Sequence, residues 1–142
     1  MTRESGVMPR RPDRPGSLEV EVIGDALDTE TVERACVLAA ATAGVEDGHV
    51  AIAFVGAGEI AALNAEHRGK EGPTDVLSFP VDGDDPLALG ERELGDVVIC
   101  PEHTVDLTEA VVHGVLHLVG MDHELDDGEM LALQAEVLSW VR

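Results

Sequence analysis

The sequence predicts a single domain in which one mixed β-sheet of four strands is covered by helices. Strand-like and helix-like segments follow one another in the order strand, helix, strand, helix, strand, strand, helix, helix. The chain has 142 residues, of which 44% are hydrophobic, and this is enough to bury one sizeable core. We expect the folded domain to occupy residues 18–142. Residues 1–17 are rich in Arg and Pro and are expected to form a disordered tail.

The first strand and the first helix have clear boundaries in the sequence. Residues 18–22 alternate apolar and acidic side chains, as a strand with one buried face does. Asp28 or Thr29 can cap a helix that runs to about Thr42. Gly44 stands just past the expected end, where glycine commonly stops a helix.

The remaining elements are predicted from apolar runs that are bounded by Gly, Pro and Asp. The three further strands are expected over residues 49–55, 75–80 and 95–100. The three further helices are expected over residues 59–67, about 107–119 and about 126–141.

The segment after the second strand resembles a dinucleotide-binding fingerprint. Gly56, Gly58 and Ala61 fit the pattern G-x-G-x-x-A between a strand and a helix. Glu59, however, would add a negative charge where the helix N-terminus would meet a pyrophosphate. This strand is also not the first, and too little sequence follows to build a second nucleotide-binding half. We interpret the glycines as a tight turn between strand and helix.

Three histidines near the C-terminus have the spacing of metal ligands. His113 and His117 are four residues apart, so they lie on one face of a helix one turn apart. Gly120 allows a positive φ, which lets the chain turn back and return His123 as a third ligand. His113 and His117 are the only ionisable residues in the apolar stretch 110–119, where unpaired imidazoles would be costly to bury. Three nitrogen ligands leave an open fourth position, which is typical of catalytic zinc.

The residue that follows the first histidine argues against a peptidase. Metalloproteases with this histidine spacing carry a glutamate there, and it takes a proton from the zinc-bound water. In this chain the position is Gly114, which has no group that can accept a proton. A zinc-bound water with a pKa near 7 can still attack a substrate such as a phosphodiester.

The charge of the chain is strongly unbalanced. There are nine Lys and Arg residues against 29 Asp and Glu, which gives a net charge of −20. Arg68 and Lys70 form the one tight basic pair in the expected folded body, whereas four arginines lie in the tail: Arg3, Arg10, Arg11 and Arg14. Such a body should repel free nucleic acid, so an RNA substrate would need local contacts and a docked partner. Aromatic content of 2% argues against base stacking on aromatic side chains.

Other features of the composition are consistent with a cytoplasmic protein. No apolar run is long enough to span a bilayer, and Met1 is not followed by a signal-peptide core, so we expect no membrane association. Cys36 and Cys100 form no CxxC motif and are expected to be small buried residues in a reducing compartment.

Four ordered segments, spread over about residues 63–129, together resemble the YbeY family of bacterial metal-dependent endoribonucleases. They are Leu63-Asn64 with Arg68, PTDVLSFP at 73–80, LGDVVIC at 94–100 and HGVLHLVGMDH at 113–123. The resemblance implies an α+β fold with a four-stranded mixed sheet. It also implies one zinc ion bound by the three histidines, and an arginine in the cleft that matches Arg68.

The same resemblance implies an endoribonuclease that cuts single-stranded RNA rather than DNA. In that family the enzyme matures the 3′ end of 16S ribosomal RNA, contributes to ribosome quality control, and has small-subunit ribosomal proteins as partners. One departure concerns the segment between Cys100 and His113, which has only 12 residues here and is usually longer and helical in the family. We therefore expect one wall of the cleft to be shortened.

The expected catalytic residues are Arg68, which would clamp the scissile phosphate, and His113, which would also bind the zinc ion. The nucleophile is either a metal-bound water or the RNA 2′-OH, and the second would leave a cyclic phosphate. Asp122 and Asp96 are candidates to orient a histidine ligand through its free N–H. Two alternatives stay open: a zinc-containing ribosome-assembly factor without catalysis, and a metal-dependent hydrolase of another substrate.

Overall fold

The computed structural model describes residues 17–82, 92–120 and 128–142, and these form one α+β domain with a four-stranded mixed sheet. The strands are β1 (Ser17–Ile23), β2 (Asp47–Phe54), β3 (Val76–Pro80) and β4 (Glu93–Ile99). Their order across the sheet is β1-β2-β4-β3. The pairs β1·β2 and β2·β4 are parallel and β3·β4 is antiparallel, so the predicted fold class is confirmed.

Helix α1 (Thr29–Thr42) forms where the sequence predicts it. Asp28 is the N-cap residue, and its carboxylate accepts a hydrogen bond from the backbone N–H of Thr31 at 3.0 Å. The hydrogen bond from the Thr31 hydroxyl, together with this backbone bond, lowers the pKa of the Asp28 carboxyl group. The helix connects the parallel strands β1 and β2, as a crossover must.

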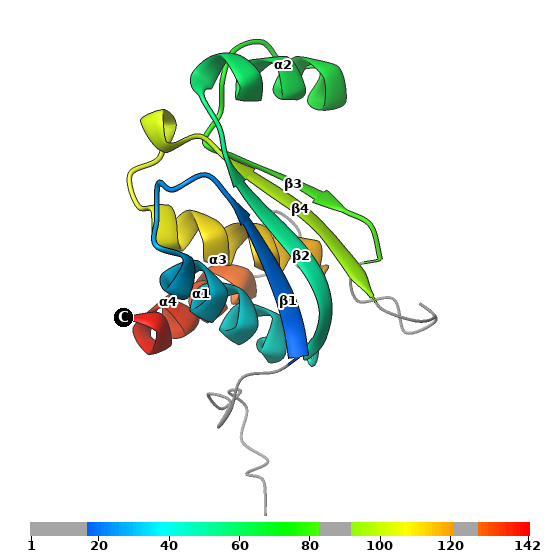
Figure 1. Ribbon diagram of the computed structural model, residues 1–142, viewed down its shortest axis with the longest axis vertical. Helices are drawn as coiled ribbons and strands as arrows, with labels where there is room; N and C mark the ends of the chain where they lie inside the picture. Colours follow the sequence, from blue (N-terminus) through cyan, green and yellow to red (C-terminus); the bar gives the residue numbers. More distant parts are fainter. Residues whose placement is uncertain (1–16, 83–91, 121–127) are drawn as a thin grey trace, which may run out of the picture.

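Helices α1, α3 (Leu107–Leu118) and α4 (Glu129–Val141) pack together on one face of the sheet (Figure 1). The main core lies between these helices and the strands, and it includes side chains that are fully buried, such as Val32, Ile52 and Val97. Burial of this apolar surface is the main stabilising term for the fold.

Helix α2 (Ala57–Arg68) lies at one end of the sheet (Figure 1). Its Ile60 is buried against Leu77 and Val98. The residues next to these two in the strands, Ser78 and Val97, face α3, so Ile60 packs on the other face of the sheet. The first free N–H of α2, that of Ala57, donates to the carboxylate of Glu102 at 3.2 Å. A carboxylate thus occupies the place where a bound pyrophosphate would lie, which agrees with the interpretation of the glycines as a turn.

The element boundaries differ from the predicted ones by a few residues. Strand β1 begins at Ser17, which we expected to belong to the tail, and residues 1–16 lie outside the described residues. A short 3₁₀ helix, Pro101–His103, was not predicted. Cys36 and Cys100 are both buried and free, and burial raises the pKa of the Cys36 thiol. No helix in the described part of the chain is long and apolar enough to cross a membrane.

Gly95 has a conformational role in the sheet. Its φ is +135°, and a Cβ atom there would lie 2.2 Å from the carbonyl oxygen of Phe79 on β3. The register between β2 and β4 shifts just before it, from His49 opposite Glu93 to Val50 opposite Gly95. Glycine therefore allows both the irregular register and the close approach of β3.

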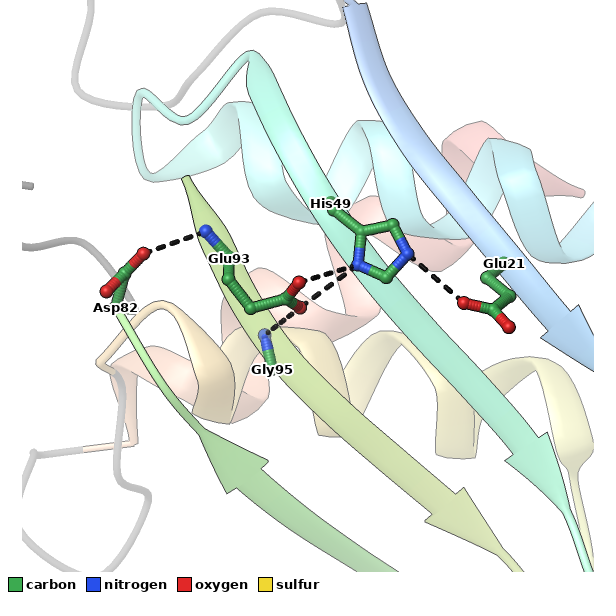
Figure 2. A network of polar contacts seen from close by, with 5 residues as sticks. All are labelled: Glu21, His49, Asp82, Glu93 and Gly95. Carbon is green, nitrogen blue, oxygen red and sulfur yellow. Dashed lines mark hydrogen bonds and ion pairs between the residues drawn. The ribbon is translucent and has the colours of Figure 1, made fainter. Parts of the chain in front are cut away.

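The shifted register creates a polar network on the sheet face turned away from α1, α3 and α4 (Figure 2). His49 Nδ1 lies 2.8 Å from Glu93 Oε1, and its Nε2 lies 3.2 Å from Glu21 Oε1. The backbone N–H of Glu93 donates to Asp82 at 2.8 Å, and that of Gly95 donates to the Glu93 carboxylate at 3.2 Å. The network connects β1, β2 and β4 through side chains and was not apparent in the sequence.

The protonated form of His49 should stabilise the fold. The hydrogen bond to Glu93 is the largest cause that raises the pKa of His49, and the contact with Glu21 adds to it. A raised pKa means that the contribution is fully present below the unfolded value of about 6.5 and is lost as the pH rises through the folded value. Since the side chain is partly exposed, we expect His49→Gln to cost at most about 1 kcal/mol at about pH 5.5 and clearly less at about pH 8.5. Urea unfolding at both pH values measures this difference.

Glu93→Gln is the matched control, because it removes the negative partner and should flatten the same pH dependence. A destabilisation by His49→Gln that grows with increasing pH would contradict this account.

Candidate metal centre

Helix α3 is buried on almost every side, except at two histidines. From Ala110 to Val119 every residue is buried apart from His113 and His117, which are half-buried. The N-terminus of α3 is capped by Asp106, whose carboxylate accepts from the backbone N–H of Glu109 at 3.1 Å. The buried residues fix the rotation of the helix, so the two imidazoles share the one side that opens to solvent.

The two imidazoles converge on one point. His113 Nε2 and His117 Nε2 are 3.1 Å apart, and the rings meet edge to face with centroids 4.7 Å apart. Two nitrogen ligands of a tetrahedral zinc ion, each about 2.0–2.1 Å from the metal, lie about 3.3 Å apart. The donor atoms and their separation therefore fit two ligands of one zinc ion.

The third expected ligand cannot be placed. His123 lies outside the described residues, and within the described ranges no group of three His, Cys, Asp or Glu side chains is arranged to hold a metal ion. The expected turn after the helix is present. Gly120 has a φ of +101°, and its N–H donates to the carbonyl of His117 at 3.0 Å. The chain thus leaves α3 at the residue where the sequence predicts a reversal.

Helix α4 supplies a polar contact to the site. Gln134 Oε1 lies 2.7 Å from His113 Nδ1, and Gln134 is 8% exposed. The sequence offers Asp96 and Asp122 as candidates for this role. Asp96 is exposed on the sheet face opposite α3, because its neighbour Val97 faces Gly114, so Asp96 does not contact His113 or His117; Asp122 lies outside the described residues. A signal for Gln134 was available, because it is the one polar residue in the inward stripe of α4: Met130, Gln134, Val137, Leu138 and Val141.

Gly114 brings α3 close to β4 and β3. A Cβ atom on Gly114 would lie 2.4 Å from Cγ1 of Val97 and 3.0 Å from its Cγ2. On β3, the Ser78 hydroxyl donates to the carbonyl of Gly114 at 3.2 Å. The position that holds the general base in metalloproteases with this spacing therefore has no room for a side chain, which strengthens the argument against that chemistry.

Arg68 is the last residue of α2 and is exposed, as is Lys70 just beyond it. Within the described residues, no hydrogen bond or ion pair joins Arg68 to His113 or His117. The residue before Arg68, His67, packs edge to face on Phe79 of the edge strand β3, with ring centroids 5.0 Å apart. The preceding residue of β3, Ser78, contacts Gly114 of α3 on the other face of the sheet.

Comparisons with known proteins agree on one family. The family model described as Endoribonuclease YbeY matches residues 19–142. Endoribonuclease YbeY of Parvibaculum lavamentivorans is 40% identical over an aligned region that covers 85% of this chain and 80% of the relative. That of Macrococcus caseolyticus is 35% identical over a region that covers 81% of this chain and 86% of the relative. The solution structure of TM1509 from Thermotoga maritima superposes with a TM-score of 0.53 at 27% identity, covering 86% of this chain and 88% of that chain.

The contact between Gly114 and Val97 can be tested by a double-mutant cycle. Gly114→Ala should destabilise the protein by about 1–3 kcal/mol, because a stiff β-branched side chain cannot move away from the new methyl group. The gain of about 1 kcal/mol in helix propensity offsets only part of this cost. Val97→Ala alone should also destabilise, by leaving a cavity.

The double variant should be less destabilised than the sum of the two single variants, since the new methyl group then fills the space that Val97 leaves. Guanidinium unfolding of the four proteins measures the coupling. Strictly additive effects would mean that α3 does not contact β4 as closely as described.

Proposed function

Since the chain belongs to the YbeY family of endoribonucleases, we propose that it is a zinc-dependent endoribonuclease that cuts single-stranded RNA. The observation that carries the proposal is the convergence of His113 Nε2 and His117 Nε2, 3.1 Å apart, on the one open side of a buried helix. His123 is the proposed third ligand. Three imidazole ligands favour zinc, copper or nickel over magnesium.

The zinc ion, when bound, would supply a Lewis acid and acidify the water at its open position. The side chains of the protein would position the zinc ion. His113 and His117 come from a helix that is fixed by its buried neighbours, and Gly114 leaves the base position empty. A phosphodiester suits such a site, because its cleavage does not require a carboxylate at the position of Gly114.

Arg68 is the proposed phosphate-binding residue. Its guanidinium carries a permanent charge and five donors in a planar fork, which fits two phosphoryl oxygens. It is exposed at the end of α2, next to His67, which contacts the edge strand whose other face contacts α3. A strand of RNA that passes around this edge would meet both Arg68 and the histidines, and its phosphate charge would be stabilised as the bond breaks.

The charge of the chain supports a substrate that is presented by a partner. A net charge of −20 opposes the approach of free RNA over long distances. We propose that the natural substrate is the 3′ region of precursor 16S ribosomal RNA, held by small-subunit ribosomal proteins in the cytoplasm, and that cleavage serves ribosome maturation and quality control. Basic ribosomal proteins would complement the acidic body of this chain.

The dependence on the histidines gives the most direct test of the activity. The wild-type protein, loaded with zinc, should cut a single-stranded RNA, and a chelator should abolish the cleavage until zinc is restored. His117→Ala should lose stoichiometric zinc and fall to background activity, because one of three ligands is removed. His103→Ala is the control, since this exposed histidine lies in the 3₁₀ turn before α3 and is not a proposed ligand. Stoichiometric zinc in His117→Ala would refute the assignment.

A second substitution separates an enzyme from a docking factor. Arg68→Lys keeps the charge but replaces the bidentate fork by a point charge, so the cleavage rate should fall about 100-fold with folding and zinc content unchanged. Lys70→Arg is the control and should retain the rate. Equal turnover by Arg68→Lys and wild type would show that the arginine does not act on the phosphate.

A further inference from the structure

We infer that Gln134 is a positioning residue that selects the tautomer of His113 and so presents its Nε2 as a metal ligand. The inference rests on the proposed function in one respect, namely that the ion binds at Nε2. The geometry itself does not depend on the ion. Gln134 comes from a different helix than the histidines and is separated from His113 by 21 positions in the sequence.

The direction of the hydrogen bond follows from the chemistry of the two groups. The carbonyl oxygen of a glutamine amide accepts hydrogen bonds and does not donate them. Gln134 Oε1 lies 2.7 Å from His113 Nδ1, so in neutral His113 the nitrogen Nδ1 carries the hydrogen and donates it. The other ring nitrogen, Nε2, then keeps its lone pair. This is the nitrogen that faces His117 Nε2 at 3.1 Å.

The burial of Gln134 strengthens the preference of His113 for the tautomer with the hydrogen on Nδ1. The residue is 8% exposed in a helix face that is otherwise apolar, so loss of the bond would leave a buried polar group without its partner. A partner of this kind fixes both the ring orientation and the tautomer of a histidine ligand. Gln134 therefore performs the role for which a carboxylate is more often used, and it does so without adding charge.

The position of Gln134 is fixed in turn by the docking of α4. Met130 and Val137, one turn away on either side, are fully buried in the main core. Near the end of the helix, Arg34 of α1 donates to the carbonyl of Trp140 at 3.2 Å, and Arg142 pairs with Asp106, the N-cap residue of α3. The same contacts that hold α4 against α1 and α3 thus hold the amide against His113.

Two substitutions at Gln134 separate positioning from packing. Gln134→Met keeps the length and shape of the side chain but removes the acceptor, whereas Gln134→Glu keeps an acceptor oxygen. Two-dimensional ¹H–¹⁵N spectra of the full-length protein without metal report the His113 tautomer, and zinc affinity is measured by competition with a chromophoric chelator. The wild type and Gln134→Glu should show the Nδ1–H tautomer. Gln134→Met should lose it and bind zinc about 10–100-fold more weakly.

Val137→Ala controls for a general loosening of α4, because it removes buried packing on the same helix and leaves the hydrogen bond intact. It should lower the stability and leave the tautomer and the zinc affinity unchanged. An unchanged tautomer and unchanged zinc affinity in Gln134→Met would overturn the inference. A wild-type chain that binds no zinc would contradict the proposed function instead, and the tautomer measurement would still decide whether Gln134 orients His113.

Discussion

Helix α3 is packed against the sheet so closely that one of its residues has no room for a side chain. Gly114 lies against Val97 of β4, and the apolar residues of α3 from Ala110 onward are buried. This contact fixes the depth and the rotation of the helix, because a packed core tolerates little adjustment. The side of α3 that carries His113 and His117 is therefore determined by packing, independently of any bound ion.

The chemistry of the site follows from the same constraint. A helix that approaches the sheet this closely excludes a base next to the first histidine, and it leaves two imidazoles whose Nε2 atoms are 3.1 Å apart on the open side. The C-terminal helix α4 places the amide oxygen of Gln134 against Nδ1 of His113. The network of His49 with Glu21 and Glu93 lies on the opposite face of the sheet and is separate from this site (Figure 2).

Local signals in the sequence predicted most of the fold. The cap at Asp28 and the alternation in β1 depend on neighbouring residues, so their positions could be predicted to within a few residues. The spacing of His113 and His117 belongs to this class, because one helical turn brings them together. The contact with Gln134 depends on how α4 docks against α3, and no local pattern determines that docking. The place of Asp96 also depends on tertiary structure, since the strand register puts it on the sheet face opposite α3.

The central claim is that the side of α3 that carries His113 and His117 holds an open zinc site made of imidazole nitrogens. X-ray absorption at the zinc edge of the purified full-length protein tests it most directly. We predict one zinc ion per chain with three imidazole nitrogens at about 2.0 Å and one further light-atom ligand. Zinc bound by sulfur at about 2.3 Å, or the absence of imidazole scattering, would contradict the account.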